Sequence, residues 1–250
     1  MSFEFHHSHF NGCFADFEIR GDDILRKKTK LRGLRYFLNE AKTHKFYSMA
    51  EVSYVPNFLG AGVEWNLRPY IEMELIKGLN LEEISKEEGR LVRRIPLLVK
   101  MADVVAGFHS FGKLHRDLKP KNFLEDEQGN VYLIDLGLAA SLGHKDHWLA
   151  DGTPAYMSPE AVSAKPLYVS SDIYSLGMIF YALLAGHPFQ DTSSIEQIMK
   201  WQIKKMPRPL IEVANVSEKV SDAVMKCLRK DPDRRYKSAE YLRDDLVAVL

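Results

Sequence analysis

The chain has 250 residues, of which 46% are hydrophobic and 27% charged, a composition typical of a globular protein with one large domain or two packed lobes. Lysine plus arginine and aspartate plus glutamate both total 34, so the formal net charge is zero. This balance argues against a general polyanion binder, and we expect no nucleic-acid partner.

Cysteine content and hydrophobic run lengths indicate the compartment. Cys13 and Cys227 are too few and too far apart for a disulfide framework or a zinc site, which favours a reducing environment. The longest apolar run, residues 174–186, is shorter than the ~20 residues that a bilayer span needs. Residues 1–10 lack the features of a secretory signal. We therefore expect a cytoplasmic protein without a membrane anchor, as a monomer or a weak dimer.

The first part of the chain predicts β structure. Its elements, in order, are an extended run at Phe14, Phe17 and Ile19, a hairpin turn at 21–23, a strand from Ile24, a helix over about 34–45, and strands over 55–62 and 68–76. These elements predict a small β-rich lobe of about 75 residues.

Beyond Gly78 the hydrophobic pattern becomes helical. Apolar residues recur at three- and four-residue steps and form one stripe: Ile95, Leu98, Met101, Val105 and Phe108. A short strand is expected over 131–136, and helices resume from Ser170. The order predicts an α+β fold with a β-rich lobe at about 1–76, a hinge at about 74–78 and a helical lobe at 79–250.

The strongest chemical signal is His115-Arg116-Asp117-Leu118-Lys119-Pro120-Lys121-Asn122, which lies in a loop between the amphipathic helix and a strand. In this loop Asp117 can accept a proton from an attacking hydroxyl, and Lys119 can neutralise charge on a transferred phosphoryl group. Asn122 can ligate a metal ion. A second signal is Asp135-Leu136-Gly137, where a carboxylate at the end of an apolar strand is suited to magnesium.

Together these motifs resemble the eukaryotic-type serine/threonine protein kinase superfamily, over nearly the whole chain. Residues 115–122 resemble its catalytic loop, and 135–137 its metal-binding triplet, with leucine in place of the usual phenylalanine. The other matching segments are 152–160, with Ser158 where alanine is usual, 171–177, and 231–236.

The resemblance implies one bilobal kinase domain over 1–250 that uses ATP and magnesium, with manganese as an alternative. It implies that Asp117 is the catalytic base, that Lys119 contacts the γ-phosphate, and that Asn122 and Asp135 hold the metal. It also implies supporting roles for further residues: Arg116 before the catalytic aspartate, Glu160 paired with Arg235, and Asp172 bracing the catalytic loop.

Two positions indicate, through the resemblance, which amino acids accept the phosphoryl group. Lys119, two residues after Asp117, resembles the serine/threonine subgroup, so the implied partners are proteins with serine or threonine acceptors. The resemblance also implies that Thr153 bonds toward Asp117 and shapes the acceptor pocket. Small-molecule kinases of the aminoglycoside type usually lack both Lys119 and the 152–160 segment.

The glycine-rich loop is the weakest match. The candidate is residues 12–17, where Gly12 is the single glycine and Phe10 and Ala15 stand where the outer glycines are usual. Asp16 adds an anion near the expected phosphates unless its side chain points outward. This departure favours an alternative function, that of a pseudokinase acting as a binding or scaffold module.

The phosphate-gripping lysine has two alternatives. If Leu25 faces the adenine, Lys27 points toward the phosphates, because side chains two residues apart on a strand share a face. Shifting the alignment with the family's strand by one residue would select Lys28 instead. We favour Lys27, with Glu40, 13 residues further on, as its helix partner.

The resemblance also assigns the adenine pocket. Met73 would be the gatekeeper, the backbone of Glu74 and Leu75 would meet the adenine edge, and Leu124 would form the floor. For regulation, we predict that Asp146 or Asp151 partly supplies the negative charge that a phosphate would otherwise bring to the activation loop, so that activity needs no phosphorylation of this loop.

Overall fold

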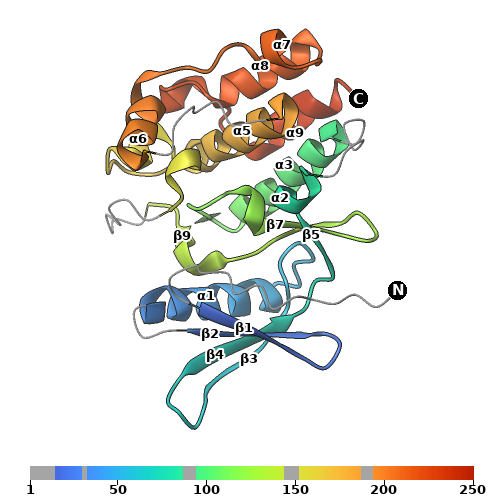
Figure 1. Ribbon diagram of the computed structural model, residues 1–250, viewed down its shortest axis with the longest axis vertical. Helices are drawn as coiled ribbons and strands as arrows, with labels where there is room; N and C mark the ends of the chain where they lie inside the picture. The colour runs from blue at the N-terminus through green and yellow to red at the C-terminus, as the bar shows by residue number, and fades with distance from the viewer. Residues whose placement is uncertain (1–14, 30–32, 87–93, 144–151, 187–193) are drawn as a thin grey trace. The chain divides into compact units, whose positions relative to one another are not determined.

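The computed structural model describes residues 15–29, 33–86, 94–143, 152–186 and 194–250 (Figure 1). They form two compact units. Unit 1 runs to Lys77 and includes Ile134–Gly137, and unit 2 comprises Gly78–Leu133 and Leu138–Leu250. The division at Lys77 falls within the segment predicted as a hinge.

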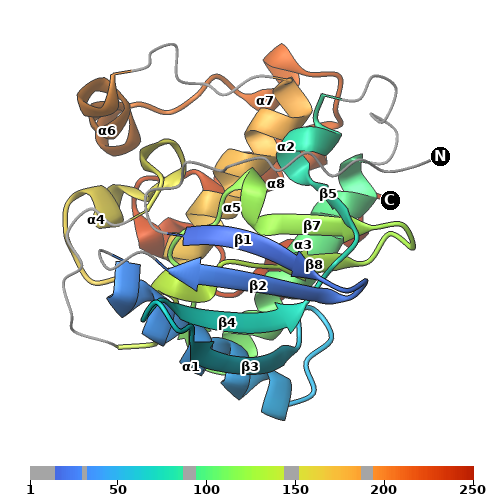
Figure 2. The ribbon, with the colours of Figure 1, turned by 60° about the horizontal axis from the view of Figure 1, so that its bottom comes forward.

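Unit 1 is an antiparallel sheet with one helix on it (Figure 2). The strands are β1 (Ala15–Arg20), β2 (Ile24–Thr29), β3 (Phe58–Val63) and β4 (Pro69–Glu74), in the order β1-β2-β4-β3. Helix α1 (Leu34–Met49) packs on the sheet through a small core of Phe37, Ile71 and Met73. Because successive strand residues alternate in direction, Leu25 joins this core while its neighbour Arg26 does not.

The other face of the sheet carries charged residues that pair with one another. The Arg26 guanidinium lies 3.8 Å from the centre of the Tyr70 ring and bonds to Glu72. Lys28 pairs with Glu18 and with Glu64. A sheet face made of such pairs needs no second layer over it.

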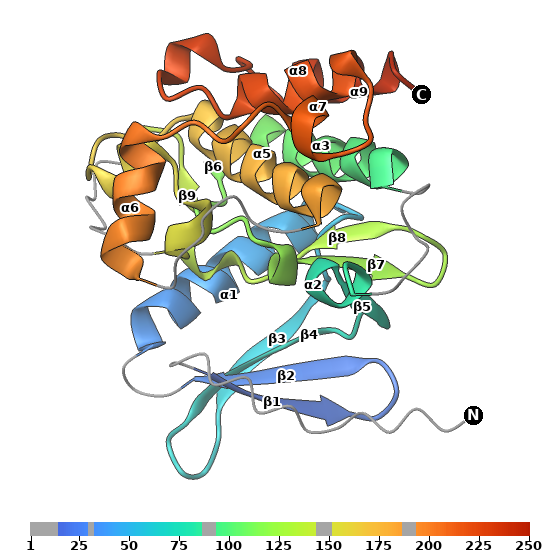
Figure 3. The same cartoon turned by 45° about the horizontal axis from the view of Figure 1, so that its top comes forward.

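Unit 2 is mainly helical (Figures 1 and 3). Its helices are α2 (Leu81–Ile84), α3 (Arg94–Ser110), α4 (Pro159–Val162), α5 (Val169–Ala185), α6 (Ile195–Lys204), α7 (Leu210–Val213), α8 (Glu218–Cys227) and α9 (Ala239–Val247). Its strands are β5 (Gly78–Asn80), β6 (Lys113–Leu114), β7 (Phe123–Asp126), β8 (Val131–Leu133) and β9 (Ala140–Ser141). β5, β7 and β8 form one sheet, and β6 pairs with β9.

Helix α5 is the central element of unit 2, since nearly all of its side chains are buried. It contacts α3 and α8 (Figure 3). At Gly177 a Cβ atom would come within 2.5 Å of Cys227 Cβ in α8, so only glycine allows the two helices to pack this closely. Helix α5 ends at Gly186, whose φ of 79° gives a left-handed cap.

Several boundaries differ from the sequence expectation. The predicted strand over 55–62 begins only at Phe58, after Pro56, which cannot donate to a ladder. The predicted strand over 131–136 stops at Leu133, because Asp135 adopts a left-handed conformation with φ 60°. Helix α1 continues four residues beyond the predicted Lys45, to Met49. None of the helices in the described ranges is long and apolar enough to cross a membrane.

Candidate active site

Asp117 is held in a fixed orientation on the loop between β6 and β7. Its Oδ1 accepts hydrogen bonds from the Thr153 amide at 2.9 Å and the Thr153 hydroxyl at 3.0 Å. Its Oδ2 accepts from Lys119 Nζ. The Asp117 residue is only 9% exposed. The structure thus brings together the predicted base, the predicted phosphate lysine and the predicted acceptor-pocket threonine.

Asn122 lies at the end of the same loop, in a 3-10 turn opened by Pro120. Its Nδ2 donates to the Asp117 carbonyl oxygen at 2.9 Å. This bond fixes which way the amide faces, so Oδ1 is the atom that could bind a cation.

A single carboxylate holds the backbone of this loop. Asp172, near the start of α5, accepts bonds from the amides of His115 at 2.8 Å and Arg116 at 2.9 Å, and from His109 Nε2 at 2.8 Å. Burial raises the pKa of Asp172, but the bonds from His109 and His115 outweigh burial, and that pKa is lowered. The carboxylate therefore stays ionised and can hold Arg116 at a φ of 72°, a left-handed conformation that costs ~1–3 kcal/mol.

Glu160 and Arg235 form the buried ion pair that the resemblance implied. Two guanidinium nitrogens donate to the two carboxylate oxygens, at 2.7 and 2.9 Å. The remaining Arg235 donors bond to backbone carbonyls of Ser170, Arg229 and Lys230. Burial raises the pKa of Glu160, but Arg235 outweighs burial and the pKa is lowered.

In unit 1, Lys27 meets two carboxylates. Its Nζ lies 2.8 Å from Glu40 and 3.0 Å from Asp135. Burial lowers the pKa of Lys27, but Asp135 and Glu40 outweigh burial, so its pKa is raised and the side chain stays charged. Burial raises the pKa of Glu40 to about 7, against the opposing effect of Lys27. The sequence predicted the Lys27–Glu40 pair but gave no signal for the direct contact with Asp135.

Lys28 and Asp16 both lie on the charged face of the sheet, away from Lys27. They are register partners across β1 and β2, so their side chains share one face. Asp16 pairs with Arg68 at 2.5 Å. The negative charge that the sequence placed near the phosphates is thus paired with a cation and directed outward.

Glu74 and Leu75, whose backbone is predicted to meet the adenine edge, lie at the end of β4 and directly after it. The Glu74 amide donates to Asn57 O and the Leu75 amide to Asp23 O, each at 2.9 Å. Both amide hydrogens therefore have partners within unit 1, and the contact of this backbone with adenine stays a prediction. Leu124 is half-buried in β7 of unit 2. Gly12, Asp146 and Asp151 lie outside the described residues.

Comparison with known proteins decides the family. Residues 24–247 match the family model described as a protein kinase domain. The chain belongs to the protein kinase family. This confirms the resemblance and the expected α+β fold, with a small antiparallel sheet followed by a helical region. Family membership implies ATP and a divalent metal ion.

Three curated relatives of this chain are named as serine/threonine kinases. A probable serine/threonine-protein kinase of Clostridium perfringens is 32% identical, over 78% of this chain and 29% of its own length. PknB of Mycolicibacterium smegmatis is 31% identical, over 72% and 30%. A probable PknB of Lactococcus lactis is 30% identical, over 80% and 33%. The chain thus spans about a third or less of the length of these relatives.

Two predicted metal ligands, Asn122 in unit 2 and Asp135 in unit 1, offer oxygen atoms of the kind that divalent cations bind. Within the described ranges, no group of three or more His, Cys, Asp or Glu residues could hold a metal. Magnesium is usually bound through one or two carboxylates together with substrate phosphates and water. The Asp135 side chain is 43% exposed, and the Asn122 amide is oriented by its bond to the Asp117 carbonyl oxygen.

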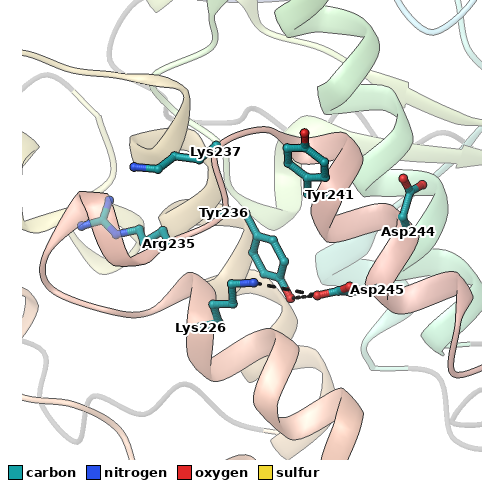
Figure 4. Close-up of a pocket in the computed structure, with 7 residues that line it drawn as sticks. All are labelled: Lys226, Arg235, Tyr236, Lys237, Tyr241, Asp244 and Asp245. Carbon is teal, nitrogen blue, oxygen red and sulfur yellow. Dashed lines mark hydrogen bonds and ion pairs between the residues drawn. The ribbon is translucent and has the colours of Figure 1, made fainter.

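Unit 2 also has a pocket of about 270 Å³ between α8 and α9 (Figure 4). Its charged side chains are already paired: Tyr236 donates to Asp245 at 2.7 Å, and Lys226 lies 3.8 Å from the centre of the Tyr236 ring. Arg235 lines the pocket but directs its guanidinium to Glu160. We assign this pocket no role.

Proposed function

We propose that the chain is a serine/threonine protein kinase that transfers the γ-phosphoryl group of ATP to hydroxyl groups of other proteins. The observation that carries this proposal is the geometry at Asp117, which pairs with Lys119 and accepts two bonds from Thr153. The curated relatives that match most of the chain carry the same description. Nothing in the described residues or in these relatives favours the pseudokinase alternative.

In the proposed reaction the oxygen of the substrate hydroxyl bonds to the γ-phosphorus of ATP, and Asp117 accepts the proton of that hydroxyl. At the same time the bond between the γ-phosphorus and the bridging oxygen of the β-phosphate breaks. Lys119, which is bonded to Asp117 before substrate arrives, then shares its charge with the transferred phosphoryl group. Thr153 keeps Asp117 aimed at the acceptor. ADP and the phosphorylated protein leave.

The nucleotide and metal roles rest on four further residues. Lys27, held by Glu40, is proposed to contact the α- and β-phosphates, and ATP would compete with Asp135 for this lysine. Asn122 and Asp135 are proposed to ligate magnesium, which when bound neutralises charge on the phosphates. Manganese offers the same octahedral oxygen coordination and is the expected substitute.

The test is phosphoryl transfer by the purified chain with labelled ATP, magnesium and a generic basic protein. We expect label on serine and threonine, identified by phosphoamino-acid analysis. Asp117→Asn should lower kcat by about 10²–10⁴-fold, because it removes the proton acceptor while keeping the shape. Asp103→Asn, at an exposed carboxylate in α3, is the matched control and should change kcat less than twofold.

Equal transfer by Asp117→Asn and the unchanged chain would disprove the role of Asp117. No transfer by the unchanged chain with any divalent metal would disprove the kinase proposal itself. The same proposal includes a cytoplasmic protein without nucleic-acid partners, supported by the zero net charge and by the free, buried thiol of Cys227.

A further inference from the structure

Gln202 is a fully buried polar residue in α6 whose amide hydrogen-bonds in two directions. Its Oε1 accepts a bond from the Tyr174 hydroxyl at 2.6 Å. Its Nε2 donates to the carbonyl oxygens of Pro154 at 3.2 Å and Ala155 at 2.7 Å. A buried amide that uses both ends in this way connects three parts of unit 2: α5, α6 and the segment after Thr153 (Figure 3).

The direction of these bonds is fixed by Lys230. Its Nζ donates to the Tyr174 hydroxyl at 2.7 Å. Burial lowers the pKa of Lys230 to about 8, so at pH 7 the group is still mainly an ammonium and can only donate. The Tyr174 hydroxyl therefore accepts a hydrogen bond from Lys230 and donates its own hydrogen bond to Gln202 Oε1. This leaves Nε2 as the end that faces the Pro154 and Ala155 carbonyls, and a flipped amide would break both sets of bonds.

The segment that Gln202 holds, residues 154–156, is a short 3-10 turn directly after Thr153. Its third carbonyl, that of Tyr156, accepts a bond from Ser175 Oγ in α5 at 2.8 Å. Three consecutive carbonyls are thus fixed by side chains from α5 and α6. None of the three residues of the turn is fully buried, so the turn presents surface beside Thr153.

We propose that Gln202 is a positioning residue for the protein substrate, because it holds the turn at 154–156 where the chain next to the acceptor residue binds. This rests on the proposed kinase function. An acceptor hydroxyl that reaches Asp117 lies beside Thr153, which bonds to that carboxylate. The neighbouring substrate residue is only ~3.3–3.6 Å further along its chain, within reach of the turn.

The proposal predicts a selective change in kinetics. Gln202→Met fills a similar volume but removes both bonding functions, and Gln202→Glu keeps an acceptor for Tyr174 while losing the donors. Both variants should raise the KM for the basic protein substrate about tenfold, the loss expected for two neutral hydrogen bonds of ~0.5–1.5 kcal/mol each. The KM for ATP should change less than twofold. Gln197→Met, on the exposed part of the same helix, is the matched control and should leave both KM values unchanged.

A purely structural role would lower thermal stability without separating the two KM values. As a readout that does not need activity, we would follow hydrogen exchange of the Tyr156 and Met157 amides, which bond to Thr153 and Pro154 carbonyls. Exchange should be faster in both Gln202 variants than in Gln197→Met. If Gln202→Met does not fold, Tyr174→Phe tests the same bonds from the other end and should raise the substrate KM about threefold.

An active chain whose Gln202 variants keep the substrate KM and the exchange rates would overturn the role of Gln202 alone. A parallel rise in both KM values would overturn it as well. An unchanged chain without phosphoryl transfer would instead refute the kinase proposal, and with it any substrate role for this residue.

Discussion

The buried pair of Glu160 and Arg235 makes a sharp quantitative prediction for Arg235→Met. The guanidinium has no exposed area and donates five hydrogen bonds, two to Glu160 and three to backbone carbonyls. The substitution leaves the Glu160 carboxylate buried without its cation. Removing one partner of a buried pair costs ~3–5 kcal/mol, so we expect a loss of about 4 kcal/mol in the free energy of unfolding. For a chain of this size that lowers Tm by roughly 8–16 °C.

Arg243→Met is the matched control, because it makes the same change at an exposed pair. Arg243 bonds to Asp103 at 2.8 Å, and the Asp103 side chain is 62% exposed. Exposed pairs contribute ~0–1 kcal/mol, so the control should lower Tm by no more than a few degrees. The double variant Glu160→Leu, Arg235→Met should regain much of the loss, since it leaves no unpaired charge.

Differential scanning calorimetry and urea unfolding of the variants provide the measurement. A Tm for Arg235→Met within two degrees of that for Arg243→Met would show that the five bonds contribute little beyond an exposed ion pair. A double variant no more stable than Arg235→Met would show that packing, not the unpaired carboxylate, causes the loss.

Three further predictions concern nucleotide binding, pH and packing. Lys27→Ala should lower kcat/KM for ATP about 100-fold or more, whereas Lys28→Ala, on the other sheet face, should change it less than threefold; equal losses would contradict the assignment. Burial lowers the pKa of His44 to about 4. Between pH 6.5 and 4 the His44 side chain is therefore protonated in the unfolded chain but neutral in the folded chain. The free energy of unfolding should therefore fall as pH falls through this range. Between pH 7 and pH 4, the difference in this free energy between His44→Leu and the unchanged chain, measured by urea unfolding, should shift by roughly 3 kcal/mol in favour of the variant. Parallel pH profiles of the two proteins would refute this. Gly177→Ala should lower the free energy of unfolding by about 1–3 kcal/mol because its Cβ would meet Cys227, and an unchanged Tm would show that the helices separate freely.

Strand alternation was enough to choose between two neighbouring lysines. A β-strand has a side-chain period of two, so placing Leu25 in the core places Lys27 beside Glu40 and Lys28 on the other face. The same rule places the Asp16 side chain on the face of Lys28, once Asp16 is known to be the register partner of Lys28. That register depends on cross-strand pairing, which a single sequence does not specify.

Some contacts between distant segments were not predictable in the same way. Asp135 meets Lys27 across 108 residues of sequence, and the left-handed backbone that directs it there has no signal in Asp-Leu-Gly alone. His109 is a lone histidine at the end of a helix, which is most often only a packing residue. Gln202 has an ordinary helical environment in the sequence, and its burial appears only when α6 lies against the turn after Thr153.

The bonds that Asp172 accepts have a consequence for the proposed binding of protein substrates. Because one carboxylate ties the end of α3 and two consecutive loop amides to the start of α5, the loop has its working shape before any ligand arrives. In the proposed reaction, the affinity for a protein substrate would then not be consumed in ordering that loop, and the carboxylate of Asp117 would need little rearrangement when a hydroxyl approaches.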